Sequence, residues 1–271
     1  MILDGRAIAA QIAASVKDRV AGLGRVPVVR AIVISPTAAT ESYLRIKTAK
    51  AQEAGMRLEL VRMENDAREA DLIGKIRLPG ADAVIVQLPL PPTMDERAVL
   101  DAILLEKDAD VLSSLSYARF LDDDEDGALV PPVACAVAEM LGRADVSVGG
   151  KRAVVVGNGR LVGAPVSAWL AREGADVSIL TRETFAEKKP LLRDAELVVS
   201  GTGSPHLITP DMLMPGAVCI DAGTSESSGA IVGDFDPACA EGASVFTPVP
   251  GGVGPVAVAC LFKNTADLLG R

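Results

Sequence analysis

Residues 151–180 read KRAVVVGNGRLVGAPVSAWLAREGADVSIL and predict a strand, a glycine turn, a helix and a second strand. The run from Ala153 to Val156 is short, apolar and rich in β-branched residues, as buried parallel strands are. Apolar residues then recur at helical spacing over residues 162–171, and Gly174 ends the helix. Such a βαβ unit presents the N–H groups and dipole of its helix to the turn. The stretch therefore predicts a nucleotide-binding turn within an α/β fold.

Strands and helices alternate through the rest of the chain. We predict further strands at residues 28–34, 58–63, 83–86, 197–199, 218–220 and 244–246. We predict helices at residues 5–23, 40–54, 66–78, 95–104, 133–141 and 255–269, with Thr40 and Asp66 as N-caps. This alternation favours open, mainly parallel sheets.

Composition narrows the classes of partner. The chain has 271 residues, enough for two compact domains or one large one. Because 49% of the residues are hydrophobic and 3% are aromatic, we expect a sizeable, mainly aliphatic core. A net charge of -9 argues against nucleic acid. No run of about 18 apolar residues predicts a membrane span, and the N-terminus lacks the pattern of a signal peptide, so we expect a cytoplasmic protein. The acidic run at residues 122–126 reads as a solvated loop, with a divalent cation site as the alternative.

Cysteine and histidine give no metal signature. The four cysteines have no close pair and no metal-ligand spacing, so we expect reduced, mostly buried thiols. The single histidine, His206, cannot supply a multi-histidine zinc site. We therefore expect no metal.

The glycine turn carries the first candidate site. Gly157, Gly159 and Gly163 give the spacing G-x-G-x-x-x-G, a variant of the dinucleotide fingerprint, in the strand–helix context that it requires. NAD-binding domains place an acidic residue at the end of the second strand, whereas this chain has Thr181 and Arg182 there. An arginine suits the 2′-phosphate of NADP, so NADP is favoured over NAD. The alternative is that Arg182 is an ordinary solvated side chain at a strand end.

Two further candidates lie in the first half of the chain. Tyr43 and Lys47 are four residues apart on one predicted helix and share a face. A lysine that lines a cleft can act as an acid or base, although most helical lysines are solvated. Gln87 follows a buried strand and precedes the stiff segment LPLPP, which directs it towards a ligand or leaves it to satisfy backbone groups.

Two loops complete the candidates. Asp108 and Asp110 are either structural carboxylates at a helix end or acceptors for the N–H donors of a ligand. The segment PGGVGP at residues 250–255 lies outside any predicted strand and lets the backbone approach a ligand closely.

Five motifs together resemble the bifunctional methylenetetrahydrofolate dehydrogenase/cyclohydrolase (FolD) family. They are ILDG at residues 2–5, YLRIK at 43–47, VQLPLP at 86–91, EKDAD at 106–110 and TPVPGGVGP at 247–255. The resemblance covers nearly the whole chain. It implies an N-terminal α/β domain for folate and catalysis, at residues 1–135 and 255–271, to which the last helix returns. Residues 136–254 would form a Rossmann-type NAD(P)-binding domain.

The resemblance also implies an activity and a set of site residues. The enzyme would oxidise 5,10-methylenetetrahydrofolate with NADP and hydrolyse the methenyl product to 10-formyltetrahydrofolate, and it would be a homodimer. Lys47, Gln87 and Asp110 would be catalytic. Lys47 would assist water addition, Gln87 would tune and orient Lys47, and Asp110 would hold the pterin. Substrate contacts would come from Tyr43, Pro250, Gly251 and Gly252. Cofactor contacts would come from Gly157, Asn158, Gly159, Arg160, Gly163, Thr181, Arg182 and Thr224.

The chain departs from the family pattern around these residues. Val111 replaces a glycine that usually follows the aspartate, so the pterin loop is expected to sit differently. Hydroxyl-bearing residues of the family are missing at Val133 and Ala257. Asn158-Gly159 and Thr181-Arg182 replace the usual Arg-Ser and His-Ser pairs.

Two alternatives to the bifunctional enzyme stay open. The drifted surroundings of the catalytic trio also fit a folate- or nucleotide-binding paralogue that has lost one or both activities. A shikimate-dehydrogenase-like oxidoreductase shares the two-domain layout but leaves the VQLPLP and PVPGGVGP motifs unexplained.

Overall fold

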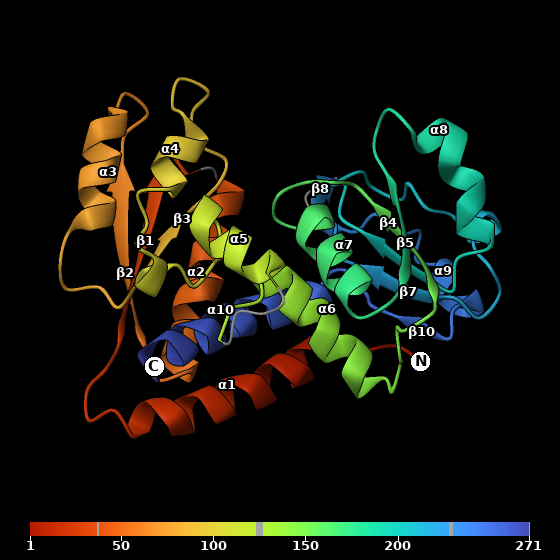
Figure 1. The fold of residues 1–271 in the computed structure, drawn as a ribbon, viewed down its shortest axis with the longest axis horizontal. Helices are drawn as coiled ribbons and strands as arrows, with labels where there is room; N and C mark the ends of the chain where they lie inside the picture. Colours follow the sequence, from red (N-terminus) through yellow and green to blue (C-terminus); the bar gives the residue numbers. More distant parts are fainter. Residues whose placement is uncertain (37, 123–126, 228–229, 271) are drawn as a thin grey trace. The chain divides into compact units, whose positions relative to one another are not determined.

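The computed structural model describes residues 1–36, 38–122, 127–227 and 230–270. The acidic run predicted at residues 122–126 lies outside the described residues from residue 123 onward. Two compact units share the chain, one formed by Ala10–Pro132 with Val258–Arg271 and the other by Met1–Ala9 with Val133–Ala257. Figure 1 labels their elements.

The unit that holds most of the N-terminal half is built on a three-stranded parallel sheet of order β2-β1-β3. Its strands are β1 (Val28–Ile34), β2 (Arg57–Met63) and β3 (Ala83–Val86), and its helices are α2 (Ala38–Glu53), α3 (Glu69–Arg77), α4 (Glu96–Leu100) and α5 (Ser114–Leu121), with a 3₁₀ turn η1 (Leu105–Lys107). β3 is apolar throughout and β1 is apolar except for Arg30, and both strands are almost wholly buried, as strands covered on both faces are. All three strands run in one direction, so the chain leaves the sheet at one edge after each of them.

The other unit contains a five-stranded parallel sheet of order β10-β7-β6-β4-β5. Its strands are β4 (Arg152–Val156), β5 (Asp176–Leu180), β6 (Leu197–Ser200), β7 (Val218–Asp221) and β10 (Val245–Phe246). The helices are α6 (Pro132–Arg143), α7 (Gly163–Arg172), α8 (Phe185–Lys188) and α9 (Cys239–Gly242), with 3₁₀ turns η2 (Lys189–Arg193) and η3 (Pro210–Met212). A separate hairpin joins β8 (Ser225–Ser227) to β9 (Ala230–Val232), which pair antiparallel.

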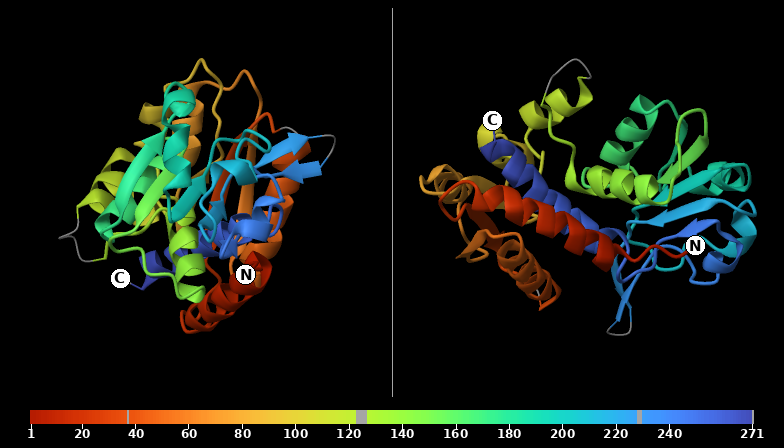
Figure 2. Two further views of the ribbon diagram at one scale, coloured as in Figure 1. Left: turned by 90° about the vertical axis from the view of Figure 1, so that its right-hand side faces the viewer. Right: turned by 90° about the horizontal axis from the view of Figure 1, so that it is seen from below.

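Two long helices, α1 (Gly5–Ala21) and α10 (Val253–Leu269), contribute to both units. Figures 1 and 2 show them side by side, and the Arg19 guanidinium lies 2.8 Å from the Asp267 carboxylate. The last helix therefore returns to the N-terminal half of the chain, as the sequence predicts. The first nine residues, by contrast, lie with the five-stranded sheet, because Leu3 N–H donates to Phe246 O at 2.9 Å.

Several predicted helix boundaries are wrong. α2 begins at Ala38 rather than after Thr40. Asp66 does not cap α3, which follows Arg68 and has no side-chain cap. Asp95 does cap α4 by accepting from Ala98 N–H at 3.1 Å, but the helix ends at Leu100. α5 and the β8–β9 hairpin were not predicted.

Candidate active site

Lys47 and Gln87, predicted from separate motifs, meet at the edge of the three-stranded sheet. Lys47 Nζ donates to Gln87 Oε1 at 3.1 Å, and the Gln87 amide donates in turn to Leu88 O at 2.9 Å. Lys47 Nζ also lies 5.0 Å from the centroid of the Tyr43 ring, within the range of a cation–π contact. The lysine is 7% exposed while the tyrosine keeps 40% of its surface. The predicted shared face of Tyr43 and Lys47 is thus present, with the amine fixed by Gln87.

The surroundings of Lys47 and Asp110 shift the pKa of each group. Burial lowers the pKa of Lys47 below its ordinary value, and Asp110 partly opposes that change. Burial likewise raises the pKa of Asp110, which Lys47 opposes and the nearby Asp108 reinforces. The charges of Lys47 and Asp110 therefore influence each other's pKa. A lysine with a lowered pKa exchanges protons closer to neutral pH, as a general acid or base must.

Asp108 and Asp110 have different surroundings. Asp108 is fully buried, and its carboxylate accepts from Leu112 N–H at 3.1 Å and Ser113 N–H at 2.8 Å. Of the two alternatives, the structural one holds for Asp108, which closes the turn before α5. Asp110 is partly exposed and is the carboxylate of the pair that couples to Lys47.

Val111 keeps the backbone conformation that a glycine would adopt. Its φ is 57°, in the left-handed region that a β-branched residue enters at a cost of about 1–3 kcal/mol. Val111 is held at this φ in a buried position, so the turn is strained. The altered position of the pterin loop stays a prediction.

The glycine turn in the other unit fits close backbone packing. Gly157 has a φ of 98°, and a Cβ there would lie 2.8 Å from Gly201 O. A Cβ at Gly163 would overlap the carbonyl oxygen of Gly157, whereas one at Gly159 would meet nothing within 4 Å. Gly157 and Gly163 thus let β4, the turn and α7 approach closely, and Gly159 leaves space beside the turn. This is the cradle that a pyrophosphate requires.

The remaining predicted cofactor residues follow the ends of β4, β5 and β7. Thr181 follows β5, where its N–H donates to Thr184 Oγ1 at 2.9 Å, and Arg182 is exposed on the same turn. Thr224 is exposed after β7, and its carbonyl lies beside Gly203. Asn158 and Arg160 are exposed within the glycine turn itself.

The loop at Pro250–Gly252 is tied to the start of the chain. Gly251 has a φ of 108°, and its carbonyl accepts from Gly5 N–H at 2.8 Å. A Cβ at Gly251 would lie 3.2 Å from the Arg6 guanidinium, and one at Gly252 would lie 2.6 Å from Pro248 O. The glycines are therefore required for the tight path of this loop, while Pro250 is exposed.

Two buried aspartates that the sequence reasoning missed organise the edge of the five-stranded sheet. Asp234 accepts from Ser200 Oγ at 2.7 Å, Thr202 N–H at 2.7 Å and Ser204 N–H at 2.9 Å. Asp221 accepts from three backbone N–H groups, including that of Asp234 at 3.2 Å. The available signal was the acidic residue that directly follows the buried run of β7. These carboxylates hold the loops next to the glycine turn.

Asp221 gives the nucleotide-binding half a predictable pH response. Burial raises the pKa of Asp221 from 3.8 to about 7, although its N–H donors oppose the change. Its contribution to stability is present below the unfolded value and is lost as pH rises to about 7. The free energy of unfolding of wild type minus that of Asp221→Asn should therefore fall between about pH 4 and 7, by at most about 1.4 kcal/mol per pH unit, and then level off.

Urea unfolding at a series of pH values measures this difference. Asp211→Asn is the control, because hydrogen bonding to Thr209 lowers the pKa of the exposed Asp211 from 3.8. Its difference should rise with pH only below about pH 4 and stay level between pH 4 and 7. A wild-type advantage at Asp221 that grows between pH 4 and 7 would contradict the assignment.

Among the residues that the structure describes, no three His, Cys, Asp or Glu side chains gather into a possible metal site. Within the same part of the chain, no helix is both long and apolar enough to cross a membrane.

Comparison with known proteins matches both halves of the chain. The family description "Tetrahydrofolate dehydrogenase/cyclohydrolase, catalytic domain" matches residues 3–110, and "Tetrahydrofolate dehydrogenase/cyclohydrolase, NAD(P)-binding domain" matches residues 131–271. The bifunctional protein FolD of Lacticaseibacillus paracasei is 37% identical over 278 residues, covering 99% of this chain and 97% of its own.

Solved structures agree with these matches. The methylenetetrahydrofolate dehydrogenase-cyclohydrolase (FolD) of Trypanosoma brucei, solved with NADP and an inhibitor, has a TM-score of 0.94 and 34% identity. It covers 100% of this chain and 97% of its own. A shikimate 5-dehydrogenase of Thermus thermophilus has a TM-score of 0.52 at 17% identity and covers 90% of this chain and 100% of its own, which is a likeness of fold alone.

Proposed function

The chain belongs to the tetrahydrofolate dehydrogenase/cyclohydrolase family, and from this membership we infer that it catalyses both reactions in one-carbon folate metabolism. It oxidises 5,10-methylenetetrahydrofolate to the methenyl form with NADP, and it hydrolyses the methenyl form to 10-formyltetrahydrofolate. The observation that carries this inference is the buried Lys47, bonded to Gln87 and coupled to Asp110.

These three side chains suit the hydrolysis. The oxygen of a water molecule bonds to the methenyl carbon while Lys47 Nζ takes the water's proton. The hydroxyl group of the adduct then gives up its proton and becomes the formyl C=O as the carbon–N5 bond breaks. N5 takes up one proton, the formyl group stays on N10, and one proton is released overall. Gln87 fixes the position of the amine through its Oε1, so the lone pair can face the reacting water. We assign Asp110 to the pterin, whose paired N–H groups a carboxylate can accept. Tyr43 offers an exposed ring face to the folate.

The glycine turn and the loops beside it suit the dinucleotide. Gly157 and Gly163 form a turn that a Cβ would fill, and the α7 N-terminus begins there. When bound, NADP accepts the two electrons of the oxidation. The protein's part is to hold the cofactor with the turn, with Thr181 and Thr224, and to hold the Pro250–Gly252 backbone in its tight path.

Cofactor choice is assigned to Arg182. An exposed guanidinium at the end of β5 can pair with the 2′-phosphate that distinguishes NADP from NAD. Arg182→Ala should raise KM for NADP by about tenfold or more, the worth of a charge-assisted hydrogen bond, and change KM for NAD less than about twofold.

Initial rates with both cofactors measure this effect. Arg193→Ala is the control, because Arg193 is also exposed in this unit but donates to Asp211 O. The Arg160→Ala variant, measured in the same way, distinguishes an effect of Arg182 on KM for NADP from an effect of Arg160, the other arginine near the glycine turn. Equal losses with NADP and NAD in Arg182→Ala would contradict the assignment.

We also propose that residues 1–135 with 255–271 carry folate binding and catalysis and that residues 136–254 carry the dinucleotide. The catalytic-domain match to residues 3–110 and the change of compact unit at residues 132 and 133 support the boundary near residue 135. The return of residues 258–271 to the unit of residues 10–132 supports the placement of the last helix. Hydrogen exchange with folate or NADP alone should show protection confined to the corresponding segments, and protection spread over both by either ligand would contradict the division.

A homodimer located in the cytoplasm is proposed on the family resemblance. Light scattering coupled to gel filtration should give twice the mass of the 28.0 kDa chain, and a monomer would exclude the dimer. Fractionation of cells should recover the protein with cytoplasmic markers.

A second candidate function is folate and nucleotide binding without turnover. Hydroxyl-bearing residues that the family usually has are absent at Val133 and Ala257. Incubation with 5,10-methylenetetrahydrofolate and NADP, followed by mass analysis of the products, separates the two functions. The enzyme yields 10-formyltetrahydrofolate, whereas the binding protein leaves the substrate unchanged.

A further inference from the structure

The turn that presents Asp110 is strained, and most of it is buried. It runs from Asp108 to Val111 between η1 and α5, and Ala109 and Val111 on either side of Asp110 are buried. The φ of Val111 is 57°, which a valine leaves readily unless other contacts hold it. The direction of the Asp110 side chain depends on this peptide unit.

Two buried polar side chains hold the turn from opposite ends. Asp108 accepts from the N–H groups of Leu112 and Ser113, just beyond Val111. Asn264 of α10 donates from one amide nitrogen to Ala109 O at 2.9 Å and to Val130 O at 2.9 Å. Asn264 is 2% exposed and is 155 residues from Ala109 in the chain. The carbonyl next to Asp110 is therefore fixed by the last helix.

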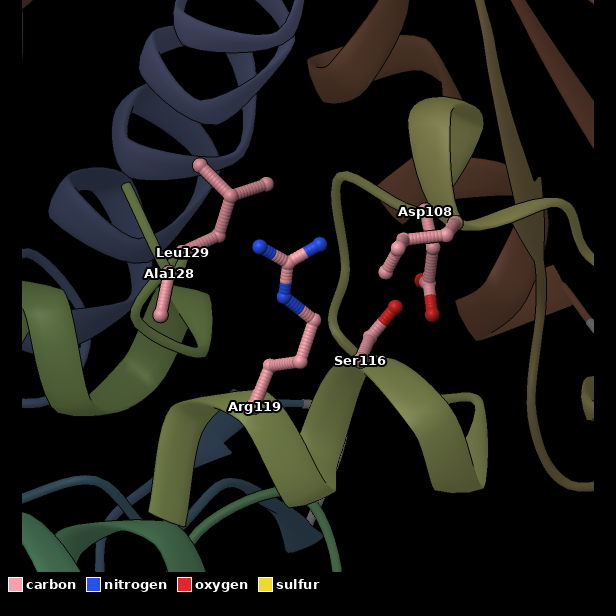
Figure 3. A pocket seen from close by; sticks show the side chains of 6 residues that line it. Asp108, Ser116, Arg119, Ala128 and Leu129 are labelled. Carbon is pink, nitrogen blue, oxygen red and sulfur yellow. The ribbon is translucent and has the colours of Figure 1, made fainter. Parts of the chain in front are cut away.

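A small pocket borders the turn on one side. Its lining includes Asp108, Ser116 and Arg119, and Figure 3 shows the Arg119 side chain pointing into it from α5. Hydrogen bonds to the N–H groups of Leu112 and Ser113 hold the Asp108 carboxylate beside this pocket. Ser113 Oγ donates to Ser116 Oγ at 2.9 Å beside the same pocket.

We propose that Asn264 is a positioning residue for folate binding, which aims Asp110 by clamping the strained turn between Asp108 and Val111. The inference rests on the proposed role of Asp110 towards the pterin. Asn264 touches neither substrate nor cofactor in this account. Its removal lets Val111 relax towards negative φ, and the Asp110 carboxylate turns with it.

The test compares two neighbouring buried residues of α10. Asn264→Ala removes both bonds to the turn, whereas Thr265→Val removes a bond from Thr265 Oγ1 to Leu261 O within the helix. Asn264→Ala should raise KM for 5,10-methylenetetrahydrofolate at least tenfold and leave KM for NADP within twofold. Thr265→Val should leave both within twofold. An equal change in KM for 5,10-methylenetetrahydrofolate in the two variants, or no change in Asn264→Ala, would overturn the proposal.

A second measurement separates this proposal from the proposed function. Hydrogen exchange at the Leu112 and Ser113 amides should be faster in Asn264→Ala than in Thr265→Val, whether or not the protein turns over folate. A wild-type protein that does not turn over 5,10-methylenetetrahydrofolate would refute the proposed function. Equal exchange rates at these amides in Asn264→Ala and Thr265→Val would refute the role of Asn264 in holding the turn. If Asn264→Ala does not fold, Asn264→Ser, which keeps one donor, takes its place with a smaller effect in the same direction.

Strain at Val111 predicts a rescue that a merely structural role would not give. Glycine adopts positive φ freely, so the turn needs less clamping in a Val111→Gly background. Asn264→Ala raises KM for 5,10-methylenetetrahydrofolate by some factor in the wild-type background. That factor should be at least threefold smaller in the Val111→Gly background. A factor that stays the same would show that Asn264 does not act through the turn.

Discussion

Lys47→Met is expected to lower the rate of methenyltetrahydrofolate hydrolysis by roughly 10²–10⁴-fold, the usual contribution of a general acid or base. Methionine keeps a comparable apolar volume but removes the amine that Gln87 holds and that takes the proton of the attacking water. Because the lysine acts by moving a proton, the loss should appear mainly in kcat and less in KM for the methenyl substrate.

The control for this prediction lies on the same helix. Lys50→Met removes an amine whose partner is the Glu53 carboxylate at 2.7 Å, near the end of α2, and should change the hydrolysis rate less than about twofold. The measurement is the disappearance of the methenyl compound above the uncatalysed rate. A Lys47→Met enzyme within tenfold of wild type would remove Lys47 from the mechanism.

The pKa of Lys47 gives this prediction a pH dependence of known sign. Burial lowers that pKa, so the neutral amine becomes available below the pH at which an exposed lysine loses its proton. The enzymatic rate of hydrolysis should rise with pH as the amine loses its proton, and the Lys47→Met enzyme should lack that rise.

Gly163→Ala is expected to abolish NADP binding, with an affinity loss of at least about 100-fold. The new methyl group would overlap the carbonyl of Gly157, so β4 and α7 must separate or the turn must open. Overpacking of this kind costs about 1–3 kcal/mol or more, and it displaces the backbone that cradles the pyrophosphate. Titration of the protein with NADP by calorimetry measures the loss.

Gly159→Ala is the matched control within the same fingerprint. A Cβ at Gly159 meets nothing within 4 Å. The melting temperature of Gly159→Ala should therefore stay within about 2 °C of that of wild type, while the melting temperature of Gly163→Ala falls. NADP affinity within threefold of wild type in Gly163→Ala would show that the turn does not bind the cofactor as proposed.

Much of the fold is predictable because several of its buried strands, such as β3 and β4, are short and mostly apolar runs. The predicted bounds of β1 and β3 agree with the structure, and the α/β class with parallel sheets is confirmed. Helix starts are less predictable, because α3 begins without a side-chain cap although Asp66 offered one. The β8–β9 hairpin was missed because β9 is mostly exposed and lacks a buried alternating face.

The residues of the candidate site that lie in local motifs are predictable from the sequence, whereas contacts between residues far apart in the chain are not. Local motifs predicted Lys47 and Gln87, and the sheet brings them together because both follow parallel strands at one edge. The sequence could not choose between structural and binding roles for Asp108, since that depends on the N–H groups it meets. Asn264 has no motif around it, and its contact with Ala109 arises only when the last helix returns.

Initial rates with 5,10-methylenetetrahydrofolate and NADP, with reduced cofactor and the methenyl compound followed separately, decide whether the protein catalyses both reactions. A bifunctional enzyme predicts that reduced cofactor forms, that the methenyl compound accumulates in a smaller amount, and that 10-formyltetrahydrofolate makes up the difference. Reduced cofactor with neither NADP nor NAD, and no hydrolysis of added methenyl compound, would contradict the account.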